Sequence, residues 1–331
     1  MFIKHMHNST YKKLHAEGLI SDATLQHAEA FETNRLFSLF WEMRLLLYLG
    51  VLLLTAGLGI LVYKNIDTIG HQAVLAFIAL VTTGSFYYCL RKKALFGWEL
   101  VNAPTPFFDY ILLLGCLSLL IFLGYLQYAY GVFGDNYGLA TFIPMIILFT
   151  AAYFFDHLGV LSLAITNLAA WAGIAITPMT ILREGNFDSP RLIYTGLLLG
   201  AILLAMGHLT VQRRLKPHFE ITYTNFGLHL FFIAALAGLF TFDKGWFLWF
   251  AGLIAAGFFC YTRAMARRSF YFVVVIILYA YIALCDAVIR LLTATYWRDA
   301  SALYLAFLYF IGSAIGIIFL LMRINRQLKN P

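Results

Sequence analysis

The sequence has very little charge for its length. Only 12% of its 331 residues are Asp, Glu, Lys or Arg, whereas soluble domains carry about 25%. Hydrophobic residues make up 62% of the chain, and the mean hydropathy is +0.81. This composition excludes an ordinary water-soluble domain and is typical of a protein embedded in a membrane.

The sequence also lacks the short motifs that are typical of common hydrolases, metalloproteases and nucleotide-binding proteins. It contains no GxSxG, HExxH or GxxxxGK[ST] motif, and no GxGxxG motif after a strand. The four cysteines form no CxxC pair and lie in or beside apolar runs, so they read as small apolar residues: Cys89, Cys116, Cys260 and Cys285. His5, His7 and His15 have no acid or cysteine at metal-binding spacing. The sequence therefore predicts no recognisable enzyme, no metal site and no cofactor.

Long apolar runs are what the sequence does contain. After Arg44, the eighteen residues of 45–62 include no ionisable group. At 1.5 Å per residue this run would form a helix ~27 Å long, close to the ~30 Å hydrocarbon core of a bilayer. No cleavable signal pattern precedes it, so we expect this run to be the insertion signal as well as the first span.

Runs of this kind recur to the end of the chain and predict an all-α, polytopic transmembrane helix bundle. The predicted domains are a cytoplasmic helical region over 1–43, a bundle over 44–323 and a basic tail over 324–331. The bundle has ten predicted spans: 45–63, 72–90, 108–129, 138–155, 159–181, 191–211, 223–242, 246–262, 270–290 and 301–322.

The basic residues alternate between the predicted loops. Seventeen of the 23 lie on one side, in segments 1–44, 91–93, 213–216, 263–268 and 323–329. Because cytoplasmic loops are enriched in Lys and Arg, this pattern predicts both termini in the cytoplasm and an even number of spans. The net charge of +7 then reflects loops beside a bilayer and does not indicate a nucleic-acid partner. We expect an inner, cytoplasmic membrane as the location.

Five spans followed by five would give halves of opposite polarity, 45–181 and 191–322. Inverted repeats of this kind occur in transporters, which also use helices bent at proline to line cavities. Pro144 and Pro178 are the candidate kinks. The inverted repeat is predicted from the number of spans alone. The alternative for the two prolines is that the helices tolerate them and that they line no cavity.

Ionisable groups in the predicted spans are candidates for a functional site, because burying charge in lipid is unfavourable. The candidates are Asp109, Asp156, His157, His208, His229, Asp286 and Arg290. Each also has a structural interpretation. Asp109 would lie in the first turn of a helix, where a negative charge interacts favourably with the helix dipole. The Asp156–His157 turn is either a turn at the membrane interface or a proton or ligand gate. Asp286 and Arg290 are four residues apart and able to pair. His208 and His229 lie on adjacent spans and are expected to approach one another.

Two GxxxG motifs are the candidate helix-packing positions. Gly196 and Gly200 form one in the sixth span, and Gly312 and Gly316 form the other in the tenth. Small residues allow helix backbones to approach closely in lipid. Packing within the chain and a homodimer seam are both compatible with this pattern.

The first 43 residues predict two short helices outside the bundle. Thr10–Glu17 would end at Gly18, and Ser21 would cap the next helix. This region either anchors the first span or docks a cytoplasmic protein partner.

These residues also carry a resemblance to a known family. The residues that carry it are Leu14, Gly18-Leu19-Ile20-Ser21 and Leu25, followed by Trp41, Arg44, Tyr48-Leu49-Gly50 and Gly57. In these residues the chain resembles the DUF2157 family of predicted bacterial membrane proteins. The resemblance covers mainly residues 10–90, and Asn65-Ile66 departs from the Asn-Trp pair common in the family. It implies a multispan inner-membrane protein with a short cytoplasmic amino-terminal region, and it brings no activity or catalytic residue.

Two functions follow as hypotheses. The first is a transporter or flippase-like protein for a small amphipathic or lipid-like substrate, with a cavity near the bilayer midplane where the two halves meet. The alternative is a scaffold or sensor that transports nothing and acts through residues 1–43.

Overall fold

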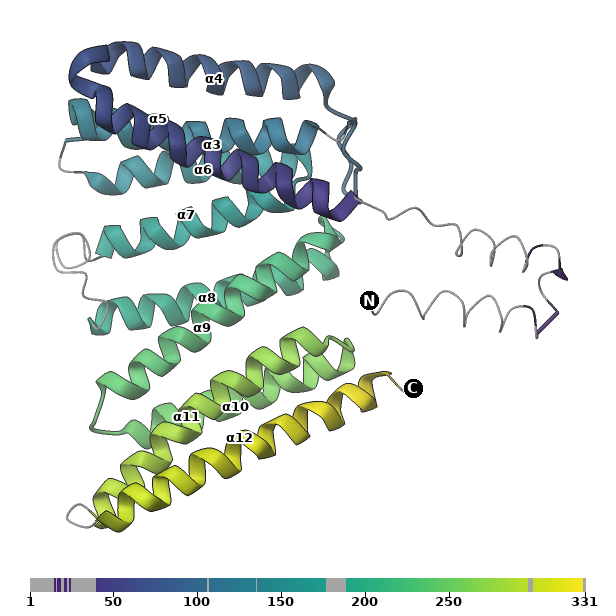
Figure 1. Ribbon diagram of the computed structural model, residues 1–331, viewed down its shortest axis with the longest axis vertical. Helices are drawn as coiled ribbons and strands as arrows, with labels where there is room; N and C mark the ends of the chain where they lie inside the picture. The colour runs from purple at the N-terminus through teal and green to yellow at the C-terminus, as the bar shows by residue number, and fades with distance from the viewer. Residues whose placement is uncertain are drawn as a thin grey trace. The chain divides into compact units, whose positions relative to one another are not determined.

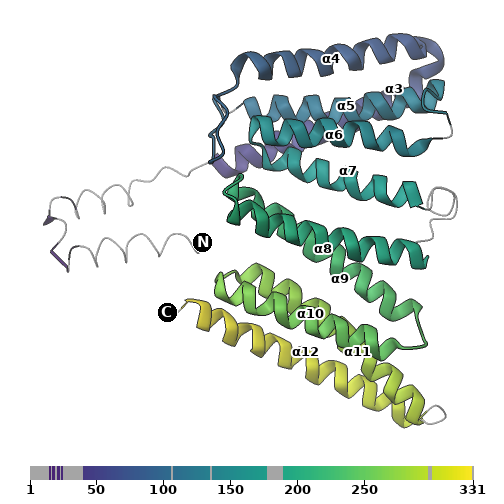
Figure 2. The same cartoon turned by 180° about the vertical axis from the view of Figure 1, so that it is seen from behind.

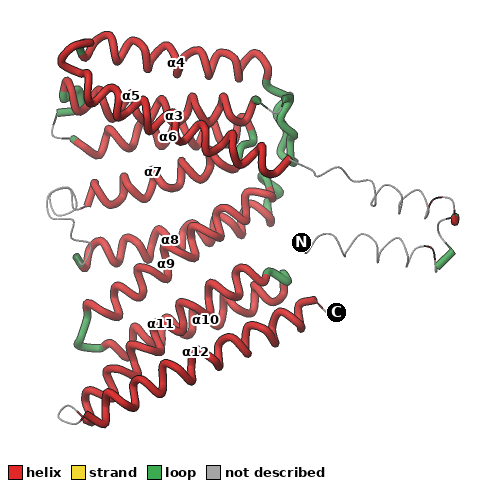
Figure 3. The backbone as a smooth tube through the Cα atoms, viewed as in Figure 1, coloured by secondary structure: helices red, strands yellow, loops and turns green. Residues whose placement is uncertain are grey.

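A computed structural model describes residues 40–105, 107–134, 136–176, 189–296 and 300–329, together with positions 15, 17, 18, 21, 22 and 24. Every regular element in these residues is a helix (Figure 3). The all-α fold class is therefore confirmed. The chain divides into two compact units, Met1–Ile60 and Leu61–Pro331, and each is considered by itself.

The described residues of the first unit fit the predicted turn and cap. Gly18 has a φ of 72°, and its N–H donates to the carbonyl of His15 at 3.0 Å. The Thr24 N–H donates to the Ser21 hydroxyl at 3.3 Å, as expected of a helix N-cap. Helix α3, Phe40–Ile69, begins in this unit. The remaining expectations for residues 1–39 lie outside the described residues.

The second unit consists of consecutive helices joined by short connections (Figure 1). In chain order they are α4 (His71–Lys92), α5 (Phe108–Tyr130), α6 (Tyr137–Phe155), α7 (Leu158–Ile176), α8 (Pro190–Gln212), the short 3-10 helix η2 (Pro217–Phe219), α9 (Glu220–Thr241), α10 (Trp246–Ala266), α11 (Phe270–Tyr296) and α12 (Ala300–Lys329).

Each predicted span coincides with one of the ten described α-helices, but α3, α11 and α12 extend five to seven residues beyond their predicted spans. The end of the predicted span 159–181 lies outside the described residues. Among the described residues, eight helical segments are long and apolar enough to cross a membrane. The apolar segments Leu45–Ile60 of α3 and Leu158–Gly173 of α7 are shorter. The protein is thus a multi-pass membrane protein, and ten crossings remain a prediction.

Helices of the second unit that follow one another in the chain pack side by side and alternate in direction (Figures 1 and 2). α4 packs on α5, α6 on α7, α8 on α9, and α10 on α11, which also contacts α12. The basic segments 91–93, 213–216, 263–268 and 323–329 consequently lie at one end, here called the basic end. The opposite end is called the far end. The membrane side that the basic end faces remains a prediction.

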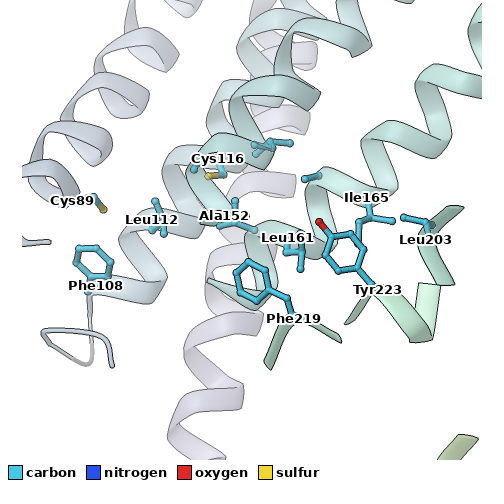
Figure 4. Packing of buried hydrophobic residues seen from close by; sticks show 14 residues of the cluster. Cys89, Phe108, Leu112, Cys116, Ala152, Leu161, Ile165, Leu203, Phe219 and Tyr223 are labelled. Carbon is cyan, nitrogen blue, oxygen red and sulfur yellow. The ribbon is translucent and has the colours of Figure 1, made fainter. Parts of the chain in front are cut away.

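Two apolar clusters form the interior of the second unit, and α9 contributes to both. The first joins α4 to α9 near the basic end and includes Leu112, Leu161 and Phe219 (Figure 4). The second joins α9 to α10, α11 and α12 around Phe232 and Val273. The first cluster contains side chains of α4 to α7 and also of α8 and α9, so helices of the two predicted halves pack against one another. The inverted repeat remains a prediction.

The two GxxxG motifs have different surroundings. A Cβ atom on Gly200 would lie 2.6 Å from the backbone nitrogen of Phe231, and one on Gly196 would lie 2.9 Å from the Cβ of Ala234. The first motif therefore allows close packing of α8 against α9. Gly312 and Gly316 of α12 have nothing within 4 Å among the described residues, so the second motif makes no such contact there.

Candidate functional site

A buried carboxylate at the basic end brings three connections together. Asp156 follows α6 in the left-handed conformation, with a φ of 59°, and only 2% of its side chain is exposed. Its Oδ1 lies 2.6 Å from Nε2 of His218 and 3.1 Å from Nζ of Lys216. Its Oδ2 accepts a hydrogen bond from the Val101 N–H at 2.6 Å. Asp156, Lys216 and His218 are called the ionic cluster below.

The connection between α8 and α9 folds so that Lys216 points inward. Arg214 and Lys216 both have positive φ values, of 53° and 54°, and Pro217 starts η2 immediately afterwards. The Lys216 N–H donates to the carbonyl of Trp98 at 3.1 Å. The 93–107 linker is therefore held at Trp98 by the α8–α9 connection and at Val101 by Asp156.

The Lys216 ammonium group is fully buried, which is rare for lysine. It lies 5.1 Å from the centre of the Phe96 ring and 3.1 Å from the carboxylate, but it is not aligned to donate a hydrogen bond to a described group. A buried lysine is tolerated when an opposite charge compensates for its lost hydration. Asp156 supplies that charge, so the burial of Lys216 depends on Asp156.

A second acid and histidine lie nearby. Asp109, in the first turn of α5, places Oδ1 3.8 Å from Nε2 of His157. The other ring nitrogen of His157 accepts the Val160 N–H at 3.1 Å, so a neutral ring carries its proton on Nε2, toward Asp109. A Cβ at Gly159 would lie 2.9 Å from the imidazole, so this glycine leaves room for the ring. Asp109, Asp156 and His157 therefore gather at the basic end.

Asp286 and Arg290 form a separate group near the far end. The Arg290 Nε donates to Asp286 at 2.8 Å, as their spacing predicted. The same guanidinium donates to Asp243 at 3.0 Å and to the carbonyl of Leu239 at 3.1 Å. Arg290 thus ties α11 to the end of α9 and to the α9–α10 connection. The contact with Asp243 was not predicted, because the two residues are 47 positions apart in the chain.

The two intramembrane histidines have separate partners. His208 accepts a hydrogen bond from the Gln212 amide at 2.8 Å, one turn further along α8. His229 lies 2.7 Å from the Tyr279 hydroxyl and 3.3 Å from that of Tyr271, both on α11. These contacts do not form a joint site. No group of three metal-binding side chains occurs in the part of the chain that the structure describes.

One of the two proline candidates lies within a described helix. Pro144 lies inside α6, seven residues after the helix begins. Pro178 lies outside the described residues.

An apolar cavity of about 450 Å³ lies toward the far end, between α7, α8 and α9. It is formed by small and aliphatic side chains: Ala169, Ala170, Ala172, Gly173, Leu192, Ile193, Thr195, Gly196, Leu199, Leu230, Ile233, Ala234 and Ala237. The hydroxyl of Thr195, which is the one polar side chain among them, donates to the carbonyl of Arg191 at 2.8 Å. The cavity thus suits a hydrocarbon group.

The comparisons with known proteins give one family. The family described as "Predicted membrane protein (DUF2157)" matches residues 12–161. These residues form a DUF2157 segment. The predicted resemblance is confirmed, and it extends beyond residue 90 to the start of α7. No curated protein and no solved structure matches the chain. The DUF2157 segment contains Asp109, Asp156 and His157, whereas Lys216 and His218 lie beyond it.

Proposed function

We propose that the protein binds a small amphipathic or lipid-like molecule in the cavity between α7, α8 and α9 and moves it through the bilayer. The cavity volume of about 450 Å³ is the observation that carries this proposal, because pockets for small ligands occupy about 300–1,000 Å³. The first and second sets of five helices meet at α7 and α8. A cavity at that junction is compatible with a transporter built from two halves.

The chemistry of the lining favours a hydrocarbon chain over an ion. Among the thirteen lining residues none is ionisable. Lipid tails are as apolar as these side chains, so a hydrocarbon chain that moves from the bilayer into the cavity gains little hydrophobic free energy. Weak retention of this kind favours exchange and movement rather than storage.

The proposed location is a bacterial cytoplasmic membrane with both chain ends inside. The gathering of four basic segments at one end of the second unit supports this orientation, because such segments are enriched on cytoplasmic faces.

Lipid movement by the reconstituted protein tests the proposal. Proteoliposomes would contain a phospholipid with a fluorescent tail, and chemical quenching from outside would report its transfer between leaflets. We expect Ala237→Phe, which fills the cavity, to slow transfer at least about tenfold, a barrier increase of about 1.4 kcal/mol. The matched control is Ala255→Phe, on an exposed surface of α10 outside the cavity. Equal transfer by both variants and the unmodified protein, or no transfer above empty vesicles, would remove the proposal.

A scaffold or sensor function through residues 1–43 is the second candidate. Its support is the division of the chain into a separate amino-terminal unit, Met1–Ile60. Deleting residues 1–35 distinguishes the two candidates: a scaffold would lose its co-purifying protein, whereas the transfer of lipid would continue.

A further inference from the structure

A second pocket, of about 80 Å³, lies at the basic end between α8, α9, α10 and the start of α11. It shares no lining residue with the apolar cavity or with the ionic cluster. Its walls combine basic and apolar side chains, so its chemistry differs from that of both sites.

The walls change from polar to apolar along the helices. His208, near the end of α8, and Glu220, at the start of α9, lie at the polar end. Arg263 and Arg267 are one turn apart at the end of α10, which places them at the same level. Deeper along the helices, Thr224 adds one hydroxyl group, and the other lining residues are apolar, among them Leu204, Leu228 and Cys260. The pocket therefore has a charged mouth and a hydrocarbon-like base.

The mouth has an excess of positive charge. Arg267 forms an ion pair with Glu220, whereas Arg263 forms no ion pair with another described residue. The Arg263 guanidinium lies 4.5 Å from the centre of the Phe259 ring, which supports its position without neutralising it. One guanidinium thus remains available for an anion.

We infer that this pocket binds the phosphate group of an anionic phospholipid from the surrounding bilayer. Arg263 is the principal contact, and Arg267 and His208 lie beside it. Guanidinium groups suit phosphate because their N–H donors match its oxygens, and basic pockets between transmembrane helices bind phospholipid headgroups. The apolar base distinguishes a lipid from free phosphate, because only a lipid has a chain to place there. This inference does not depend on the proposed transfer of lipid.

Lipid retention by the detergent-purified protein tests the inference. Native mass spectrometry would compare the binding of phosphatidylglycerol and phosphatidylcholine with identical chains. We expect phosphatidylglycerol to bind more tightly, and Arg263→Gln to weaken its binding at least about tenfold through loss of a charge-assisted contact. Arg213→Gln makes the same change of charge at an exposed position of the basic end outside the pocket, and should leave binding unchanged.

Glu220→Gln supplies a test of opposite sign. It removes the carboxylate that neutralises Arg267, so phosphatidylglycerol should bind severalfold more tightly. A merely structural role for this ion pair would instead reduce binding or leave it unchanged.

Three results would overturn the inference. The first is equal binding of the two lipids, and the second is an equal effect of Arg263→Gln and Arg213→Gln. The third is full occupancy by inorganic phosphate at the concentration at which phosphatidylglycerol binds, since this would identify a site for the free ion rather than for a lipid.

Discussion

The ionic cluster gives the sharpest prediction for stability. Replacing Asp156 by Asn keeps an oxygen for the Val101 N–H but removes the negative charge beside Lys216. Lys216 is fully buried, so the variant would leave an ammonium group with no opposite charge at hydrogen-bonding distance. Removing one partner of a buried ion pair typically costs about 3–5 kcal/mol. The retained hydrogen bond places our expectation near the lower value, about 3 kcal/mol.

A double-mutant cycle separates this effect from general damage. Lys216→Met removes the stranded charge, so the double variant with Asp156→Asn should recover most of the loss. The free energy of unfolding would be measured by titrating a folded, micelle-bound sample with sodium dodecyl sulfate. Asp286→Asn is the matched control: Arg290 keeps its contacts with Asp243 and Leu239, and the loss should stay below about 1 kcal/mol. A loss of less than about 0.5 kcal/mol for Asp156→Asn would refute the reasoning.

Further predictions concern helix packing, topology and the amino-terminal unit. Gly200→Ala should destabilise the protein by about 1–3 kcal/mol, because its Cβ would meet the backbone of Phe231, whereas Gly312→Ala has open space and should change stability little. Equal unfolding curves for both variants would contradict this packing. In intact cells, a membrane-impermeant maleimide should label cysteine placed at Lys244 but not at Arg268, and the reverse result would invert the proposed orientation. Deleting residues 1–35 should leave lipid transfer unchanged, and its loss in vesicle assays would show that the amino-terminal unit takes part.

Much of the fold could be predicted from hydropathy because length and apolar character decide where a chain crosses lipid. The predicted span 108–129 and the observed α5, Phe108–Tyr130, nearly coincide. The turn at Gly18 and the Ser21 cap were predictable for a similar reason, since each depends on a local conformation.

The sites were harder to predict because they depend on which way each helix faces. Helices that are apolar all round show no stripe to orient them, so the contact of His229 with α11 rather than with His208 was not evident. For the same reason, the sequence did not reveal that Gly200 packs closely against a neighbouring helix whereas Gly316 does not.

The burial of Lys216 was missed for another reason. Beside Arg213 and Arg214 it has the sequence context of an exposed loop charge, and only its left-handed backbone directs it toward Asp156. Pro217 gave no signal of this conformation, because the residue before a proline favours an extended backbone, whereas Lys216 has φ 54° and ψ 66°.

The most direct test of the proposed lipid-binding cavity is a high-resolution cryo-electron microscopy map of the protein in phospholipid nanodiscs. We predict an elongated density between the far ends of α7, α8 and α9, in contact with Ala169, Leu199 and Ala237. A map in which α7 closes against α8 and leaves no space between these residues would contradict the proposal.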